Sequence, residues 1–473
     1  MFNLITQIVK SNYPQADIRL IEKAYSTASR YLRGQKRGNL NYIDHPVGTA
    51  LTLARMKMDQ VVVVAALLHD LPRHSEYGVE DIGRDFGPDV GKIMVNLNAI
   101  SHIDSRFRGT DRYLESARRM FIAVAKDYRV ILIKLAERLN NLEHLDSFPV
   151  EKQKRYIEMS EKLYIPLASL LGLWRLRADM EDICFKYRHP QEYQKIKDKL
   201  DKGLRSLGDQ IVEQVRQKIS KLAKKQGLAF EISTRFKHIR GIHKKMQEKN
   251  KGFNEIYDAF AVRIIVSTVW DCYSMLGIIH SLWRPKPRRV KDYIAAPKPN
   301  GYRSLHTTVF SDEGYPMEFQ VRTQEMQDEA RYGLAAQYFY KHPHLNEDIS
   351  HWIGEILNTR KQHEENDVKD FTFDLLSNRI FVYTPKGDVI ELAEGATPLD
   401  FAYMIHTDVG NHCVSVLVND IKRPFDYQLR NNDVVEIITR STKKPAKSWL
   451  RSVRTRYARQ QILKALEIEA KTS

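Results

Sequence analysis

Cysteine is scarce in this sequence of 473 residues. Its three cysteines, Cys184, Cys272 and Cys413, lie far apart, and none forms a C-x-x-C pair. Such a sparse, odd-numbered set favours a reducing compartment and argues against a structural zinc site built on thiolates. No apolar run approaches the roughly 18 residues that span a bilayer. The start, MFNLITQIVKSNYPQ, lacks the features of a secretion signal. We therefore expect a cytoplasmic protein with no membrane partner.

Internal repeats and low-complexity tracts are also missing, whereas positive charge is abundant and uneven. The formal net charge is +16. Residues 235–303 hold 15 Lys and Arg against 5 Asp and Glu, and residues 440–473 hold 10 against 2, so the rest of the chain is nearly neutral. Two basic regions on a neutral body predict polyanionic partners, either ligand phosphates or nucleic acid. The alternative is that they are solvated faces.

The chain is long enough for two to four domains, and its patterns change along the way. Residues 1–195 place apolar residues at three- and four-residue spacing, which predicts an all-α domain. Residues 200–342 alternate short β-rich runs with helical stretches, which indicates α/β or α+β structure. A polar linker (343–370) precedes a compact unit (371–440) that reads as strand, turn, strand and helix, with Thr397 and Asp400 as N-cap candidates. A basic helical tail (441–473) follows. The predicted fold class is multidomain α+β.

Two carboxylates stand out in the basic part of the second region. Asp258 lies at the mouth of the apolar strand YDAFAVRII, and Glu318 opens MEFQVRT. Period-two alternation puts Glu318, Gln320 and Arg322 on one face of that strand. Two such carboxylates can hold Mg²⁺, which prefers oxygen ligands and keeps substrate phosphates in its shell. The alternative is a pair of surface acids, each bound to an arginine.

The segment between these carboxylates, RRVKDYIAAPKPNGYRSLHTTV, is crowded with polar and basic side chains, and RFKHIRGIHKKM upstream adds more cations. Among the polar and basic residues of the two segments are Arg235, Lys237, His238, Lys244, Lys245, Arg289, Lys291, Lys298, Asn300, Tyr302, Arg303 and His306. Cations there can neutralise phosphates, and Tyr302 can stack on a base. Cations around a two-carboxylate metal site suit phosphoryl transfer.

These motifs, together with YGLAAQYFYK, resemble the synthetase domain of the RelA/SpoT homologue (Rel) family. They cover about a hundred residues in the family's order. The resemblance implies a nucleotidyltransferase-like domain with a mixed sheet. It also implies transfer of pyrophosphate from ATP to the 3′-hydroxyl of GTP or GDP, which releases AMP and makes the alarmone (p)ppGpp of the stringent response.

Carried over position by position, the resemblance assigns roles to residues of the second region. Asp258 and Glu318 match Mg²⁺ ligands, and Glu318 is also placed to activate the 3′-hydroxyl. Arg289 and Lys291 belong to a basic loop motif typical of bifunctional members. Tyr302 matches the tyrosine that stacks on guanine. The other nucleotide-binding matches are Lys298, Asn300 and His306 for GTP or GDP, and Arg235, Lys237 and Lys245 for ATP. Gly241, His243 and Gln337 depart from the usual pattern, which bears on nucleotide affinity.

Residues 1–195 resemble the family's helical HD-type hydrolase domain. His69 and Asp70 in ALLHDLPRH follow an apolar run, as a metal-ligand pair on a buried helix would. The resemblance adds His45 and Glu137, a mixed nitrogen and oxygen set that suits Mn²⁺. Glu137 stands where the family usually has Asp.

In hydrolase-active relatives a Glu-Asp pair stands at the positions of Arg73 and His74. General acid–base catalysis typically raises a reaction rate by about 10²–10⁴-fold. We therefore predict a degenerate, weak or inactive hydrolase, with His74 as a base as the alternative. Glu80 and Asp81 match an ordinary helix start and do not replace the missing pair. Asn141 matches a substrate-side Asn, and Lys36-Arg37 offers contacts to guanine nucleotide.

Residues 371–440 resemble a TGS domain, a small ubiquitin-like module that contacts uncharged tRNA on the ribosome. His406 matches the histidine placed for that contact, with a core histidine as the alternative. The basic tail resembles the start of a further helical region and is a second candidate for RNA binding. The leading hypothesis is a (p)ppGpp synthetase. Its alternatives are a bifunctional synthetase/hydrolase and a non-catalytic ribosome or tRNA sensor.

Overall fold

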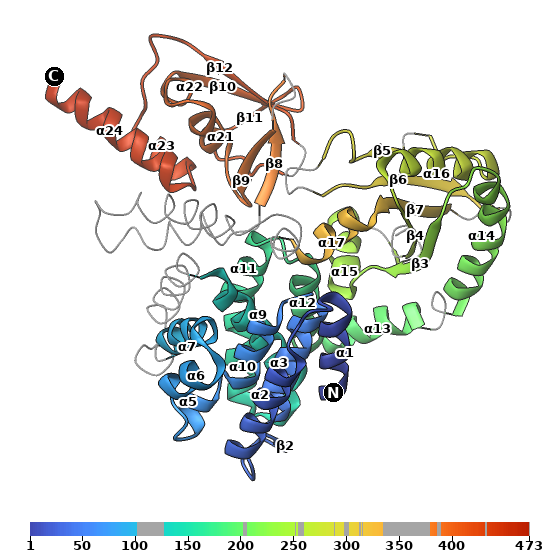
Figure 1. Cartoon of the computed structure of the whole chain (residues 1–473). Helices are drawn as coiled ribbons and strands as arrows, with labels where there is room; N and C mark the ends of the chain where they lie inside the picture. The colour runs from blue at the N-terminus through green and yellow to red at the C-terminus, as the bar shows by residue number, and fades with distance from the viewer. Residues whose placement is uncertain are drawn as a thin grey trace. The chain divides into compact units, whose positions relative to one another are not determined.

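A computed structural model describes the chain as two compact units, whose described residues fall within 1–333 and 379–472 (Figure 1). The residues that the structure describes are 1–101, 127–201, 206–250, 252–253, 260–287, 289–297, 302–311, 314, 316–333, 379–385, 389–430 and 433–472.

The described residues among the first 200 are mainly helical, as their periodicity predicts. The helices are α1 (Phe2–Asn12), α2 (Ile18–Tyr31), α3 (Asp44–Arg55), α4 (Gln60–Leu68), α5 (Leu71–His74), α6 (Val79–Phe86), α7 (Pro88–Ser101), α9 (Tyr128–Glu143), α10 (Val150–Met159), α11 (Ile165–Leu170), α12 (Trp174–Arg188) and α13 (Pro190–Lys199), with short 3₁₀ and π turns at Leu145–Ser147 and Ser160–Tyr164. Helix α3 packs on α4 and α9.

Helix α4 is a buried helix made of residues that usually favour strands. Its sequence QVVVVAALL is buried from Val62 to Leu68. An all-round apolar surface marks a helix in the middle of a core. Asp59 caps it, accepting a hydrogen bond from the Val62 amide at 3.0 Å. The helix therefore ends deep inside the domain, at His69.

One feature departs from the all-helical prediction for residues 1–195. Strands β1 (Lys36–Arg37) and β2 (Leu40–Asn41) form a small antiparallel hairpin. Gly38 lies in its turn at φ +62°, and a Cβ there would meet the Ser147 carbonyl oxygen at 2.1 Å. Only glycine fits both the backbone conformation and the space. The hairpin brings Lys36 and Arg37 to the α9 region.

Residues 206–333 form a five-stranded mixed sheet with flanking helices, as the strand and helix pattern predicts. The sheet order is β3 (Phe230–Phe236), β4 (Phe260–Val266), β7 (Pro316–Thr323), β6 (Leu305–Phe310) and β5 (Lys291–Asp292). Strands β4 and β7 pair in parallel, and the other neighbours are antiparallel. The helices are α14 (Ser206–Lys225), α15 (Ile239–Lys249), α16 (Val269–Leu282) and α17 (Gln324–Tyr332).

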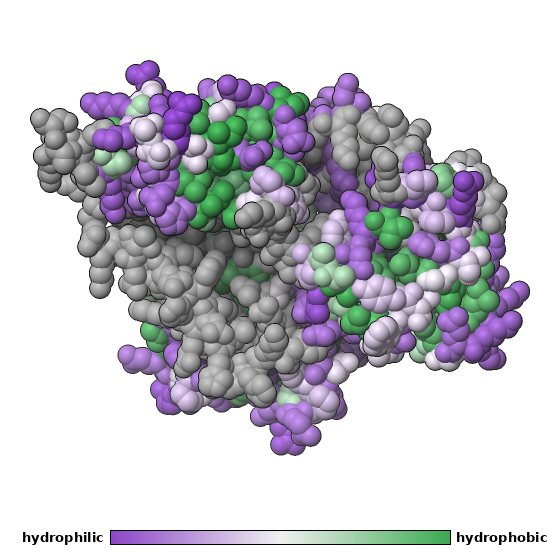
Figure 2. Space-filling view, turned by 90° about the horizontal axis from the view of Figure 1, so that it is seen from above, coloured by the Kyte–Doolittle hydropathy of each residue, from purple (hydrophilic) through white to green (hydrophobic). Residues whose placement is uncertain are grey.

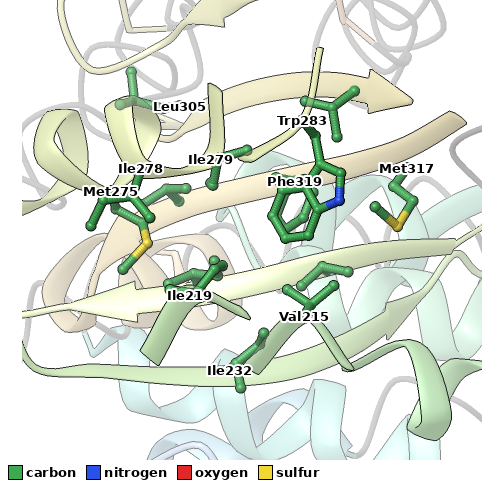
Figure 3. Close-up of a cluster of buried hydrophobic side chains, with 14 of the residues drawn as sticks. Val215, Ile219, Ile232, Met275, Ile278, Ile279, Trp283, Leu305, Met317 and Phe319 are labelled. Atoms are coloured by element: carbon green, nitrogen blue, oxygen red, sulfur yellow. The ribbon is translucent and has the colours of Figure 1, made fainter. Parts of the chain in front are cut away.

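One face of this sheet is apolar and is covered by α14 and α16 (Figures 1 and 3). Val215 and Ile219 of α14 meet Ile279 of α16 in this core, and the ring of Trp283 stacks on Phe319 with centroids 5.5 Å apart. Because strand side chains alternate between faces, the residues between these apolar ones point to the opposite face. That face carries the polar residues described below.

The helical part and the sheet part of residues 1–333 are joined by direct contacts. Asp182 of α12 accepts hydrogen bonds from the amides of Ile239 and Arg240 at 3.2 and 2.8 Å, so it caps α15 from another helix. Lys57, in the turn after α3, pairs with the buried Asp328 of α17 at 2.7 Å. An apolar cluster of Phe185, Ile196, Leu200, Ile239, Ile242 and Phe253 lies beside the cap.

The second unit is small and also has a core of its own. Strands β8 (Arg379–Tyr383) and β9 (Val389–Ala393) form a hairpin, and β11 (Ile421–Arg423), β10 (Cys413–Val418) and β12 (Val435–Thr439) form a second sheet. Helix α21 (Pro398–Ile405) begins with a capping box of Thr397 and Asp400, the predicted N-cap residues. Helices α22 (Thr407–Asn411), α23 (Trp449–Ser452) and α24 (Arg456–Thr472) complete it.

The basic tail is built into this unit. Trp449, Val453, Ala458 and Ile462 lie in the same apolar cluster as the strands. Asp400 accepts a hydrogen bond from the Thr455 amide at 2.8 Å, which ties α21 to the start of α24. One side of the tail is therefore a packed surface, and several of its basic side chains are exposed, namely Lys444, Lys447, Arg451, Arg454 and Lys464.

Among the described residues, no helix is long and apolar enough to cross a membrane. Figure 2 shows hydrophilic residues over much of the visible face, with smaller hydrophobic areas among them.

Candidate active sites

The structure brings together the four metal ligands predicted in the helical domain. His45 lies near the start of α3, His69 ends α4, Asp70 precedes α5, and Glu137 lies on α9. Ligand atoms of His45, His69 and Glu137 lie within 4.8 Å of one another. Asp70 Oδ2 is 3.6 Å from Nε2 of both histidines. Residues from four elements therefore converge on one point.

Each imidazole donates a hydrogen bond from Nδ1, which leaves Nε2 without a proton and able to bind a metal. His69 Nδ1 lies 2.7 Å from the Ala66 carbonyl oxygen, which can only accept, so Nδ1 carries the proton. His45 Nδ1 lies 2.7 Å from Asn140 Oδ1, which also can only accept, so this Nδ1 carries a proton too. The Nε2 atoms of both rings are buried, and no described residue gives them a hydrogen-bond partner. Two orphaned lone pairs beside two carboxylates fit a divalent cation with nitrogen and oxygen ligands, such as Mn²⁺.

The two carboxylates of this cluster are held ionised. Burial opposes ionisation of Asp70, but His69 and His45 lower its pKa to about 2. Burial likewise opposes ionisation of Glu137, and Lys134 and His69 lower its pKa well below the usual value. Burial lowers the pKa of His45 to about 3, so it is neutral. Ionised carboxylates and neutral imidazoles are the forms that bind metals.

A cavity of about 410 Å³ opens beside this cluster. Its wall holds the two carboxylates Asp70 and Glu137 together with several aromatic rings. The six cations on the wall are Lys36, Arg37, Arg73, Lys134, Arg138 and Lys152. A metal cluster at the edge of such a wall suits a ligand that carries several phosphates.

Arg73 and His74 both line this cavity, where the resemblance expects two acids. His74 Nε2 lies 2.7 Å from the Tyr42 hydroxyl, which also donates to Asp70 Oδ2 at 3.1 Å. Burial lowers the pKa of His74, opposed by Asp70 and aided by Arg73, which favours the neutral ring. Asp81 accepts from the Gly78 amide at the start of α6, as an ordinary helix start does.

Asn141 also reaches the cavity wall, and Arg37 donates to its Oδ1. Arg37 Nη1 lies 3.6 Å from Asp70 Oδ2. The hairpin thus supplies a cation that links the metal cluster to Asn141. The pair Lys36-Arg37 was singled out on sequence alone, and both residues lie on the cavity wall.

The second site lies on the polar face of the five-stranded sheet. Its registers align Arg235 of β3, Ala261 of β4, Glu318 of β7 and Thr308 of β6 in one row. The next row on the same face runs Ser233, Arg263, Gln320, His306 and Lys291. Strand alternation therefore collects predicted residues from four strands on one surface.

Hydrogen bonds connect the side chains on this face. Glu318 Oε1 accepts from Gln320 Nε2 at 3.0 Å and lies 3.6 Å from His306 Nδ1. Gln320 Oε1 accepts from Arg235 at 3.2 Å and from Arg322 at 2.8 Å. The contacts place Glu318, Gln320 and Arg322 on one face, as the alternation predicts.

Two arginines of this face were not singled out as site residues on sequence. Burial and the nearby Arg322, Arg235 and Arg331 lower the pKa of Arg263 to about 9. Burial also lowers the pKa of Arg322, which is 2% exposed. Crowded, buried cations favour an anionic ligand. The sequence pattern could have identified them, because Arg263 and Arg322 alternate with apolar residues in their strands.

Several predicted residues lie at the margin of this face or outside the described residues. Asp258, Lys298, Asn300 and Gln337 fall outside the described residues. Lys291 pairs in register with His306, and Arg289 lies in the turn before β5. Lys245 lies on α15, and Lys237 directly follows β3 with its side chain beside Gly241.

His406, the candidate tRNA contact, lies between α21 and α22 with its side chain 65% exposed. Its Nδ1 accepts a hydrogen bond from the Asp408 amide at 3.2 Å. The alternative of a core histidine is therefore wrong, and the ring is accessible to a partner.

Comparison with known proteins matches three families along the chain. The family described as a region found in RelA / SpoT proteins matches residues 234–344, the HD domain matches 24–174, and the TGS domain matches 380–439. The bifunctional (p)ppGpp synthase/hydrolase SpoT of Escherichia coli K12 is 34% identical over 475 residues, covering 99% of this chain and 67% of that protein. This chain belongs to the RelA/SpoT family.

Other members of the family are named either as a pyrophosphohydrolase or as a pyrophosphokinase. A guanosine-3′,5′-bis(diphosphate) 3′-pyrophosphohydrolase of Aquifex aeolicus is 39% identical over 97% of this chain, and a GTP pyrophosphokinase of Myxococcus xanthus is 37% identical over 96%. The chain spans 66% and 61% of the lengths of these two relatives. Among solved structures, small alarmone synthetase 1 of Bacillus subtilis bound to pppGpp aligns with 34% of this chain and 97% of its own, at 22% identity and a TM-score of 0.25.

Proposed function

We propose that this protein is a (p)ppGpp synthetase that transfers pyrophosphate from ATP to the 3′-hydroxyl of GTP or GDP. The observation that carries the proposal is the polar sheet face, where Glu318, His306 and Tyr302 lie in one hydrogen-bonded network beside Arg235 and Arg263. The 3′-oxygen attacks the β-phosphorus of ATP, the bond to the α,β-bridging oxygen breaks, and AMP leaves.

On the acceptor side, Tyr302 stacks on guanine, while His306 and the predicted Lys298 and Asn300 hold the nucleotide. Glu318 takes the proton of the 3′-hydroxyl as that oxygen attacks. On the donor side, Arg235, Lys237 and Lys245 hold ATP, and Arg289 and Lys291 support the transferred group. The crowding of Arg235, Arg263 and Arg322 supports a polyphosphate ligand, because four negative charges would relieve their mutual repulsion.

Magnesium is the cofactor proposed for this site, where it would neutralise phosphate charge and align the reacting oxygens. Glu318 is one proposed ligand and Asp258 is the other. Glu318 Oε2 has no hydrogen-bond partner among the described residues, so it is available to a metal or a proton.

For the helical domain we propose a divalent metal site of His45, His69, Asp70 and Glu137, with Mn²⁺ as the expected ion, and a weak or inactive (p)ppGpp hydrolase. The supporting observation is that Arg73 and His74 line the cavity in place of acids. The Asn141 side chain and the cavity's cations would still hold a guanosine polyphosphate.

A bifunctional synthetase/hydrolase is the second candidate. It is favoured by the convergence of all four proposed ligands and by His74, which lines the cavity beside them and whose pKa burial lowers, so that its ring can accept a proton. Relatives named as hydrolases also favour it. A third proposal concerns partners: the exposed His406 and the basic tail suit contact with uncharged tRNA on the ribosome.

The deciding experiment supplies the purified chain with Mg²⁺, ATP and GDP and separates the nucleotides. We expect AMP and a 3′-pyrophosphorylated product in equal amounts. Absence of product, with and without ribosomes, would favour the non-catalytic sensor. Release of pyrophosphate from ppGpp with Mn²⁺ would establish the bifunctional reading.

Glu318→Gln tests the assignment of the base. It keeps the shape and the hydrogen bond to Gln320 but cannot accept the proton, so we expect synthesis to fall by at least about 10³-fold with an unchanged fold. Glu231→Gln, on the edge strand β3, is the matched control and should leave turnover intact. Retained activity in Glu318→Gln would show that the base is misassigned.

A further inference from the structure

We infer that Arg322 is a positioning residue that orients both Tyr302 and Glu318 through two arms of polar contacts. This inference rests on the proposed synthetase function, but its geometry can be tested without turnover. Arg322 lies on β7 with only 2% of its surface exposed. No carboxylate of the described residues pairs with it, so its partners are neutral groups.

One arm runs through Tyr302. Arg322 Nη2 donates to the Tyr302 hydroxyl at 2.8 Å, and its guanidinium carbon lies 5.1 Å from the ring centroid. The same hydroxyl lies 2.8 Å from His306 Nε2. Arginine can only donate, so the hydroxyl accepts from Arg322, and we infer that it gives its own proton to His306 Nε2, because His306 Nδ1 faces the Glu318 carboxylate and is the better-placed donor. His306 then carries its proton on Nδ1, the atom 3.6 Å from Glu318 Oε1.

The other arm runs through Gln320. The second proton on Arg322 Nη2 goes to Gln320 Oε1 at 2.8 Å, and Arg235 donates to the same oxygen at 3.2 Å. Two cationic donors fix the amide with Oε1 toward the arginines. Gln320 Nε2 therefore faces Glu318 Oε1, to which it donates at 3.0 Å.

Both arms end on the same oxygen of Glu318. Oε1 receives an N–H from Gln320 and faces one from His306, so the carboxylate is held with Oε2 as the available oxygen. The guanidinium of Arg322 thus orients Tyr302, which is proposed to stack on the acceptor base, and Glu318, which is proposed to take the proton of the acceptor's 3′-hydroxyl. A primary ammonium is a compact point charge and cannot reproduce the planar donor geometry.

The geometric test is the tautomer of His306, read from ring ¹⁵N chemical shifts of the histidine-labelled full chain. His306→Gln identifies the signal. We expect the Nδ1–H form in the wild-type protein and a shift toward the Nε2–H form in Arg322→Lys and in Tyr302→Phe. An Nε2–H tautomer in the wild-type protein, or an unchanged tautomer in Arg322→Lys, would overturn the inference.

The kinetic test compares Arg322→Lys with Arg216→Lys. Arg216 lies on α14, where it donates to the Ile232 carbonyl on the apolar side of the sheet. Misplacement of a reacting group by about 1 Å can cost 10²-fold. We expect kcat of Arg322→Lys to fall about 10- to 100-fold, with KM for ATP within about threefold. Arg216→Lys should keep wild-type values. A KM increase with unchanged kcat in Arg322→Lys would show direct substrate binding instead and would overturn the positioning role.

Arg322→Ala with added methylguanidinium separates positioning from a structural role. A free guanidinium can refill the space and restore the donors, so we expect kcat to recover at least about tenfold while the melting temperature hardly changes. Loss of activity without rescue, with a lower melting temperature, would indicate a structural role and overturn the inference. If the wild-type chain makes no product, the synthetase proposal fails, whereas the tautomer measurement still decides the role of Arg322.

Discussion

Lys134 Nζ lies 2.7 Å from Glu137 Oε2, and both residues belong to α9. Their side chains are 10% and 14% exposed, so water screens the pair weakly. Glu137 is also one of the proposed metal ligands. The ammonium therefore holds one of the two carboxylate oxygens of a proposed ligand, and its positive charge opposes a divalent cation there, so we expect lysine and metal to compete for Glu137.

Lys134→Met should strengthen Mn²⁺ binding about tenfold. Removing the ammonium frees Glu137 and removes a positive charge near the metal; about 1.4 kcal/mol corresponds to that factor. Titration followed by the EPR signal of free Mn²⁺ measures it. Lys152→Met is the control, because Lys152 lines the same cavity but lies over the Phe148 ring at 4.4 Å. Weaker binding in Lys134→Met than in the control would show that no competition exists.

The tautomer of His45 gives a second prediction. Its Nδ1 proton goes to Asn140 Oδ1, which leaves Nε2 for the metal. Asn140→Leu removes the acceptor, and loss of such a partner typically lowers metal affinity by about 10–100-fold. Asn140→Asp keeps an acceptor in place and should bind Mn²⁺ at least as well as the wild type. Calorimetric titration distinguishes the two variants, and equal affinities would mean that Asn140 does not set the tautomer.

Restoring acids at the cavity wall should restore hydrolysis. The double variant Arg73→Glu, His74→Asp replaces a cation and an imidazole by the acid pair that the family resemblance implies at these positions. We expect Mn²⁺-dependent release of pyrophosphate from ppGpp to rise by about 10²-fold or more. Glu80→Gln with Asp81→Asn, at the start of α6, should not change hydrolysis in that background. No gain in the double variant would show that Glu137 fails to hold the metal productively.

The spacing of apolar residues in the sequence predicted those features of the fold that depend on local backbone geometry. The apolar run before His69 had to be a buried helix once strands were ruled out by the surrounding helical pattern, and Glu318, Gln320 and Arg322 had to share a face because strand side chains alternate. The Thr397 and Asp400 cap followed from the same short-range chemistry. The small hairpin at Gly38 was missed because two-residue strands carry no periodic signal.

Long-range pairing could not be read from the sequence. Arg263 meets Gln320 only because β4 and β7 pair in parallel in that register. Asp182 caps a helix that begins 57 residues later, and Lys57 pairs with Asp328, 271 residues away. These contacts depend on strand order and on how the helical part packs against the sheet part, which composition and spacing do not specify.

The Lys57–Asp328 pair supports the contact between those parts. Asp328 is 1% exposed and keeps a hydrogen bond from Gln324 at 3.0 Å when Lys57 is removed. Lys57→Met removes the cationic partner of a buried carboxylate, and we expect the free energy of unfolding to fall by about 1–3 kcal/mol. Denaturant titration measures it. The double variant with Asp328→Asn should lose less than the sum of the singles, and simple additivity would show that the pair is not coupled.

His280 gives a prediction about pH. It lies on α16 with Nε2 2.9 Å from Thr307 Oγ1, and burial lowers its pKa from the ordinary value of 6.5. As pH falls below about 6.5, the unfolded chain takes up a proton at His280 while the folded protein does not, so the free energy of unfolding decreases until the lower, folded-state pKa is passed. His280→Gln cannot take up this proton and should flatten the decrease measured by denaturant titration between pH 7 and 5. Ser281→Ala, next in the chain and not titratable, should keep the wild-type slope. An equally steep decrease in His280→Gln would mean that other groups cause it.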